Sequence, residues 1–217
     1  RNEGLESGDT KSIAQLGEYI FVATDDNIYR TNNQGLLWEP SGNDLDGIYI
    51  KNLLVHNDVI FAATYLRGMF SSTDFGNSWS SISNGFPAKY PYYLETDGIN
   101  IFCGTYLDGL YRSSDMGQTW TQLTNGLNAP SVIALLSFED KLFASTLNSG
   151  LFISSDAGNS WTPLNTNMSL VFDFVHLNGE LYASSLFEGV FSSSDNGQSW
   201  TQINNGLSEM NVRSLGT

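Results

Sequence analysis

The stretch ISSDAGNSW at residues 153–161 decides the fold, because copies of it recur along the chain. Full copies are SSTDFGNSW (71–79), RSSDMGQTW (112–120) and SSSDNGQSW (192–200), and a degraded copy is RTNNQGLLW (30–38). Every tryptophan of the chain closes one copy: Trp38, Trp79, Trp120, Trp161 and Trp200. Their spacings are 41, 41, 41 and 39 residues. A period of this size indicates a repeat architecture.

Each copy lies in a unit of four short β-rich runs. In the fourth unit these are VIALLSF (132–138), KLFAST (141–146), GLF (150–152) and WTPL (161–164), with Gly, Asn and Asp residues between them. No segment carries a sustained helical period. Four strands in about 41 residues match the size of a propeller blade. The sequence therefore predicts an all-β fold, a β-propeller of four-stranded blades, with a solenoid of stacked sheets as the rival architecture.

The units predict a single propeller domain over residues 1–217. Its five complete repeats cover about 10–43, 48–85, 90–126, 131–167 and 170–206, and residues 207–217 begin a further repeat. We label the strands of a blade A to D from the axis outward. The opening NEGL matches the end of a D strand, and the closing MNVRSLGT matches the start of an A strand. Three explanations stay open: a larger ring, an unusual strand exchange that closes the ring, or self-assembly through the C-terminal strand.

The pattern Ser/Thr-x-Asp-x-Gly-x-x-Trp resembles the Asp-box, also called the bacterial neuraminidase repeat. This motif occurs in β-propellers such as sialidases, sortilin-type receptors, xyloglucan hydrolases and photosystem assembly factors. The degraded first copy departs from the motif at Asn33. The residues that carry the four full copies are Ser72, Asp74, Gly76, Trp79, Ser113, Asp115, Gly117, Trp120, Ser154, Asp156, Gly158, Trp161, Ser193, Asp195, Gly197 and Trp200.

The resemblance implies that each box is a turn between strands C and D. A short Asp side chain accepts hydrogen bonds from nearby backbone N–H groups, and Gly tolerates a positive φ. The Trp would then cover the turn. A calcium loop would need further oxygen ligands at alternating positions, which Phe75, Met116 and Ala157 interrupt. We therefore expect structural boxes and no metal.

Composition narrows the classes of partner. The chain has 217 residues, with 9 Lys+Arg against 23 Asp+Glu and a net charge of −14, which disfavours nucleic acid and anionic membranes as partners. No apolar run approaches the roughly 20 residues that span a bilayer. The single cysteine, Cys103, and two histidines leave no disulfide framework and no Cys or His metal cluster, so we expect no cofactor. The acidic, Ser-, Thr-, Asn- and Gly-rich chain resembles secreted or surface-displayed bacterial propellers.

The resemblance places ligand sites on the face that the B–C and D–A connections share. The B–C loops differ in chemistry from blade to blade, which suits recognition. Tyrosines there could stack on sugar rings or grip a peptide, or could pack between blades. The sequence predicts a non-catalytic binding or scaffold propeller that recognises a glycan or protein partner. Its candidate binding residues are Tyr65, Arg67, Tyr106, Asp108, Phe187 and Glu188 from B–C loops, and Tyr90 and Tyr92 from residues 83–94.

Two other functions stay open, and both follow from the resemblance. A xyloglucanase-like glycoside hydrolase, or a fragment of one, needs two carboxylates, for which the candidates are Asp46, Asp108 and Glu188. An assembly factor for a membrane complex is the second alternative. A sialidase site would require an arginine triad, and the chain's few arginines and missing Arg-Ile-Pro signature argue against it.

Overall fold

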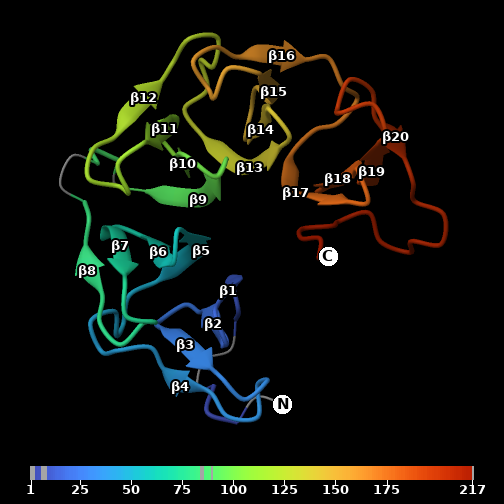
Figure 1. The fold of residues 1–217 in the computed structure, drawn as a ribbon. Helices are drawn as coiled ribbons and strands as arrows, with labels where there is room; N and C mark the ends of the chain where they lie inside the picture. The colour runs from blue at the N-terminus through green and yellow to red at the C-terminus, as the bar shows by residue number, and fades with distance from the viewer. Residues whose placement is uncertain (1–2, 6–8, 84–85, 89, 217) are drawn as a thin grey trace. The chain divides into compact units, whose positions relative to one another are not determined.

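The computed structural model describes residues 3–5, 9–83, 86–88 and 90–216. These residues form twenty β-strands in five four-stranded sheets and no helix, which confirms the predicted all-β fold of four-stranded propeller blades (Figure 1). The chain divides into two compact units, each described by itself. Unit 1 comprises residues 1–103 and 112–121, and unit 2 comprises residues 104–111 and 122–217.

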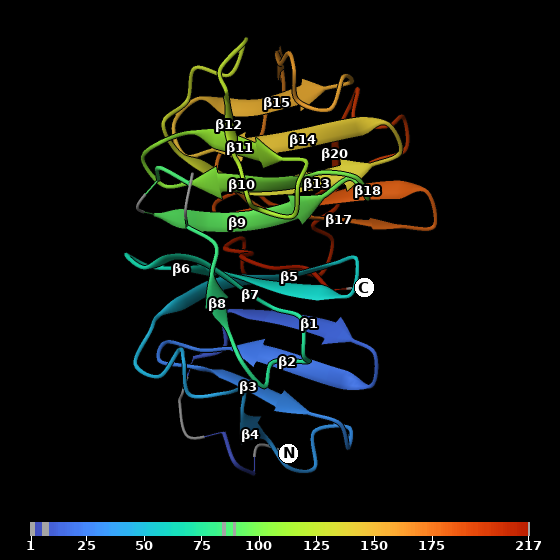
Figure 2. The same ribbon diagram turned by 60° about the vertical axis from the view of Figure 1, so that its left-hand side comes forward.

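Unit 1 contains the first two blades, each an antiparallel meander in chain order. Figure 2 shows the strands of blade 1 in succession. Blade 1 consists of β1 (Ser12–Leu16), β2 (Tyr19–Ala23), β3 (Ile28–Thr31) and β4 (Glu39–Pro40). Blade 2 consists of β5 (Ile50–His56), β6 (Val59–Thr64), β7 (Gly68–Ser72) and β8 (Ser80–Ser81).

The third sheet also pairs its strands in chain order, and its residues are divided between the two units. Blade 3 consists of β9 (Pro91–Thr96), β10 (Ile101–Thr105), β11 (Leu110–Ser113) and β12 (Thr121–Leu123).

Unit 2 contains the last two blades, again as antiparallel meanders. Blade 4 consists of β13 (Val132–Phe138), β14 (Lys141–Thr146), β15 (Gly150–Ser154) and β16 (Thr162–Leu164). Blade 5 consists of β17 (Val171–Leu177), β18 (Glu180–Ser185), β19 (Gly189–Ser193) and β20 (Thr201–Gln202).

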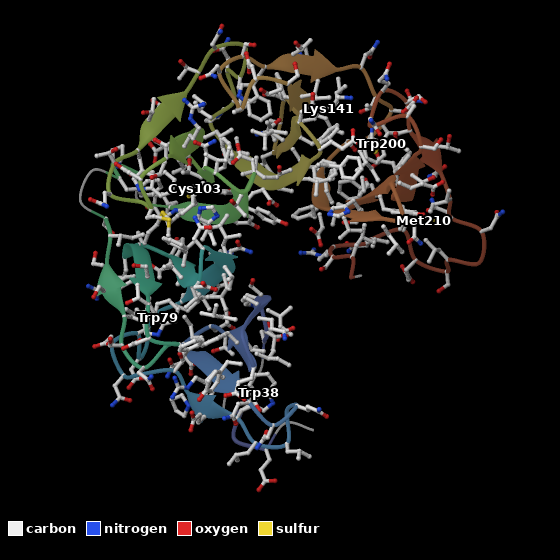
Figure 3. All side chains as sticks on the ribbon, viewed as in Figure 1. Trp38, Trp79, Cys103, Lys141, Trp200 and Met210 are labelled. Atoms are coloured by element: carbon white, nitrogen blue, oxygen red, sulfur yellow. The ribbon has the colours of Figure 1, made fainter. Side chains whose placement is uncertain are left out.

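The second strands of blades 2, 3 and 4 are almost wholly buried. In β14, five consecutive residues from Leu142 onward are buried, because neighbouring sheets cover both faces of a strand at the centre of a stack. Small residues fill one position of these strands, and Cys103 occupies that position in β10, fully buried (Figure 3). Burial raises the pKa of the Cys103 thiol. Cys103 is therefore a packing residue.

A bulge near the start of the first strand ties consecutive blades together. The strand register shifts between Ile50 and Asn52, and again between Val171 and Asp173. The polar residue after the bulge reaches the next first strand, so that Asn52 Oδ1 accepts a hydrogen bond of 2.9 Å from Leu94 N. In unit 2 the tail runs alongside β17 (Figure 1), and Leu215 N donates to Asp173 Oδ2 at 3.0 Å. Residues 211–216 therefore dock on β17 as a first strand does.

Candidate functional site

Five turns that end in the repeated tryptophans link the third and fourth strands of the blades. We call them Trp turns 1 to 5, at residues 31–38, 72–79, 113–120, 154–161 and 193–200. In Trp turn 2 the Ser72 hydroxyl donates to Asp74 Oδ1 at 2.7 Å and accepts from Gly76 N at 2.9 Å. Asp74 also accepts from Ser78, at 3.0 Å from its backbone N and at 2.7 Å from its hydroxyl. Both carboxylate oxygens of Asp74 thus accept hydrogen bonds from within the turn.

These hydrogen bonds stabilise the charged form of the aspartates. The Ser78 hydroxyl, with further bonds from the turn, lowers the pKa of Asp74 to about 2. The pKa values of Asp156 and Asp195 are also lowered to about 2, chiefly by the hydroxyls of Ser160 and Ser199. No group of three or more His, Cys, Asp or Glu residues among those described could hold a metal ion. The geometry makes these carboxylates structural acceptors.

Sequence reasoning missed one feature of the Trp turns. The residue before each turn glycine also has a positive φ, 57° at Phe75 and 54° at Ala157. The glycine itself follows with φ near 80°, as at Gly76 with 76°. Two successive left-handed residues reverse the chain tightly, and only the glycine is recognisable from sequence.

An aromatic cluster forms in unit 1 from loop and strand residues of blade 2 and the segment before β9. Tyr65 is 48% exposed, in the turn between β6 and β7. Its ring lies 6.0 Å from that of Tyr49, edge to face, and 5.5 Å from that of Tyr90. Both separations fall in the favourable range for aromatic pairs. The cluster therefore holds an exposed ring in a fixed orientation.

Two lysines complete the cluster. Lys51 Nζ lies 5.0 Å from the ring centre of Tyr49 and 4.7 Å from that of Tyr92, which are cation–π distances. Lys11 Nζ lies 5.6 Å from the Tyr49 ring centre and forms an ion pair of 3.1 Å with Asp25. We call Tyr49, Tyr65, Tyr90, Tyr92 and Lys51 the tyrosine surface.

The tyrosine surface unites three of the predicted binding residues, Tyr65, Tyr90 and Tyr92. Arg67 lies in the same β6–β7 turn as Tyr65 and is exposed. Tyr49 and Lys51 were missed as binding candidates. The signal for Tyr49 was its place in the connection between β4 and β5, whereas Lys51 lies at the register shift of β5 and gave no such signal.

The other predicted binding residues belong to unit 2 and lie in their own turns. Phe187 is 63% exposed and Tyr106 is 44% exposed. The Ser131 hydroxyl donates to the backbone carbonyl of Tyr106. Asp108 N donates to Thr105 Oγ1 at 2.9 Å. Tyr106 and Asp108 share the turn between β10 and β11, and Phe187 and Glu188 share the turn between β18 and β19.

Two of the three candidate glycosidase acids have carboxylates that accept hydrogen bonds from neighbouring side chains of their own unit. Asp46 is in unit 1, where its Oδ1 accepts from Asn27 Nδ2 at 2.6 Å. Glu188 is in unit 2, where its carboxylate accepts from Ser169 Oγ at 2.5 Å and from Ser185 Oγ.

The five four-stranded sheets define the class of the chain as a β-propeller domain. The sequence profile of the DUF6242 beta propeller domain matches residues 104–213, slightly more than half of the chain. The chain belongs to this family. No curated protein matches the chain at the sequence level.

Solved structures share the fold at low sequence identity. The extracellular domain of BT4673 from B. thetaiotaomicron is 14% identical, with a TM-score of 0.78 over 93% of this chain and 28% of that one. The GH74 enzyme of Niastella koreensis is 18% identical, with a TM-score of 0.66 over 93% of this chain and 32% of that one. YCF48 from Cyanidioschyzon merolae is 13% identical, with a TM-score of 0.65 over 88% and 70%. The chain thus spans about a third or less of the first two structures.

Proposed function

We propose that this domain is a non-catalytic recognition module that binds a glycan through the tyrosine surface. The observation that carries the proposal is the half-exposed ring of Tyr65, held between Tyr49 and Tyr90. An ordered, exposed aromatic ring offers an apolar platform to the C–H face of a sugar, and loses little rotamer freedom on binding. Hydroxyl groups of the tyrosines supply polar contacts at the rim of the same platform.

We also propose that the module acts outside the cell or on its surface. The acidic composition with few cysteines supports this location, and so do the extracellular relatives of the same fold. The described part of the chain has no helix with the length and apolar character of a bilayer crossing. A protein ligand on the same surface is the alternative partner.

The test is retention of the protein on a panel of insoluble and gel-embedded polysaccharides, compared with Tyr65→Ala and Tyr90→Ala variants. We expect each substitution to weaken binding about tenfold, the loss of roughly 1.4 kcal/mol of stacking. Tyr182→Ala is the matched control, because this tyrosine is half-buried in unit 2 and bonds Glu180 at 2.8 Å. No retention on any polysaccharide, or equal retention of all four proteins, would refute the proposal.

A turnover assay separates the binding module from the glycosidase alternative. We expect the fluorophore of a fluorogenic glycoside to be released no faster with the protein than in buffer alone. Release that disappears in Asp46→Asn, Asp108→Asn or Glu188→Gln would replace the proposal with carboxylate-pair hydrolysis.

A further inference from the structure

The last repeat is shorter than the others, and the missing residues lie in one connection. Eight residues, 124–131, join β12 to β13, whereas six residues, 165–170, join β16 to β17. This difference accounts for the spacing of 39 residues between Trp161 and Trp200. Both the longer and the shorter connection belong to unit 2.

The longer connection caps the next Trp turn. Asn125 O accepts a hydrogen bond of 3.0 Å from Trp161 N, and Gly126 packs so closely that a Cβ there would lie 2.0 Å from Trp161 O. Leu127 is buried at 3% exposure, and Trp161 is buried at 5%. The first connection caps Trp turn 2 in a similar way, with Asp44 Oδ2 accepting from Trp79 N at 2.8 Å.

The shorter connection leaves Trp turn 5 without this cap. Trp200 is only half-buried (Figure 3), and no described residue accepts a hydrogen bond from its backbone N–H. A cavity of about 390 Å³ opens beside it, within the usual size range of ligand pockets. Met168 and Phe191, both buried, contribute apolar lining. We call this cavity the blade-5 pocket, and its polar lining residues are Asn165, Thr166, Asn167, Glu188, Gln198, Ser199 and Gln202.

The lining of the blade-5 pocket selects for one ligand chemistry. It holds four carboxamides, two hydroxyls, one carboxylate and an indole, and no lysine or arginine, so it offers no positive charge to an anion. Gln202 Nε2 donates to Glu188 O at 2.6 Å and Gln198 Nε2 donates to Asp195 O at 3.2 Å. Each amide can make up to four hydrogen bonds, so one bond leaves donors and acceptors for a ligand. Paired donors and acceptors beside an aromatic residue match a polyhydroxylated ring.

We propose that the blade-5 pocket binds a neutral saccharide unit. The ligand's hydroxyls bond the carboxamides and the free N–H of Trp200, and its apolar face lies against the aromatic lining. The argument uses only residues of unit 2. It stands independently of the tyrosine surface, which belongs to unit 1.

The decisive experiment exchanges the connection. Residues 165–170 are replaced by the sequence of residues 124–131, TNGLNAPS, which rebuilds the cap over Trp200. Saturation-transfer NMR and calorimetry then compare the parent and this variant with glucose, galactose, mannose, xylose, N-acetylglucosamine and cellobiose. We expect the parent to bind at least one of these at millimolar affinity and the exchanged variant to lose that binding at least tenfold.

Two point variants keep the proposal testable if the variant with the exchanged connection does not fold. Gln202→Ala removes an exposed lining residue and should weaken binding several-fold. Gln122→Ala is its counterpart in blade 3, where Gln122 Nε2 donates to Asp108 O at 2.7 Å, and should leave binding unchanged. Tyr65→Ala should also have no effect, which separates this site from the tyrosine surface. The proposal is overturned if no sugar of the panel binds the parent, or if binding survives both the exchange and Gln202→Ala.

Discussion

Trp turns 1 and 2 share a backbone path but are held by different side chains. In turn 1 the Thr31 hydroxyl donates to Asn33 Oδ1 at 2.7 Å, and Leu37 N donates to the same oxygen at 3.1 Å. In turn 2, Ser78 stands at the position of Leu37 and adds a hydroxyl bond to the second oxygen of Asp74. The amide oxygen of Asn33 therefore replaces one carboxylate oxygen, and the second bond is lost.

The tryptophan of turn 2 is also more buried and better hydrogen-bonded than the tryptophan of turn 1. Trp79 is buried, and its indole N–H donates to Ser41 O at 2.9 Å. Trp38 is half-buried, and among the described residues its buried indole nitrogen finds no hydrogen-bond partner. The comparison teaches that the tight turn needs only an oxygen acceptor and a glycine. The carboxylate, the hydroxyl and the bonded indole add stability to the same turn.

The largest effect should come from removing a fully packed tryptophan. Trp161→Ala deletes a side chain that is 5% exposed and bonded to Gly158 O at 3.0 Å. We expect a loss of about 3–5 kcal/mol in unfolding free energy. Trp38→Ala should cost about 1–2 kcal/mol, because less area is buried and an unpaired donor is removed with it. Urea denaturation measures both, with Trp161→Phe as a milder variant, and equal losses would contradict the comparison.

Replacing the hydrogen-bond acceptors Asp74 and Asn33 should lower the free energy of unfolding by a smaller amount. Asp74→Ala removes the bonds to Ser78 and Ser72, with an expected loss of about 1 kcal/mol at pH 7, while Asn33→Ala should cost less. The folded pKa of Asp74 is about 2, below its ordinary value of 3.8. The ionised carboxylate of Asp74 therefore contributes its full stabilisation above pH about 4. This contribution is lost as the pH falls through about 2.

The measurement is urea denaturation of the parent, Asp74→Ala and Asn33→Ala at pH 7, 4 and 2. The difference between the parent and Asp74→Ala should shrink between pH 4 and pH 2. The difference for Asn33→Ala should stay constant, because an amide does not titrate. A constant difference for Asp74→Ala would show that its charge does not stabilise the turn.

The smallest effect should come from repairing Trp turn 1. The double variant Asn33→Asp, Leu37→Ser restores both the carboxylate and the hydroxyl, and Leu37 is 52% exposed, so little apolar burial is lost. We expect a gain below about 1 kcal/mol, seen as a raised urea midpoint. Asn33→Asp alone should gain less, since Leu37 offers no hydroxyl. A double variant no more stable than the single one would show that the second bond contributes nothing.

The period predicted the fold because it reports what every blade repeats. Four strands, a turn with an acceptor and a glycine, and a closing tryptophan recur, and each follows from local chemistry. Tyr65 and Tyr90 were also predictable as aromatics on loops. Their mutual packing with Tyr49 was not, because it depends on how separate loops approach each other.

The sites lie where the repeat departs from itself, and sequence indicates only the place of the departure. The 39-residue spacing showed that two residues were missing before Trp200. Whether a neighbouring side chain would fill that space depends on packing, and the pocket emerges only from coordinates. Packing likewise decides the surroundings of His56 at the end of β5, which is buried at 5% exposure with its Nδ1 2.8 Å from the hydroxyl of Thr96.

The reactivity of the single cysteine can report the opening of blade 3. Cys103 is fully buried and burial raises its pKa, so a thiol reagent can modify it only after β10 becomes exposed. The labelling rate then reports how often the third sheet opens, and no cysteine has to be introduced for the measurement. The same rate measured in the presence of a ligand would reveal whether binding in either unit slows that opening.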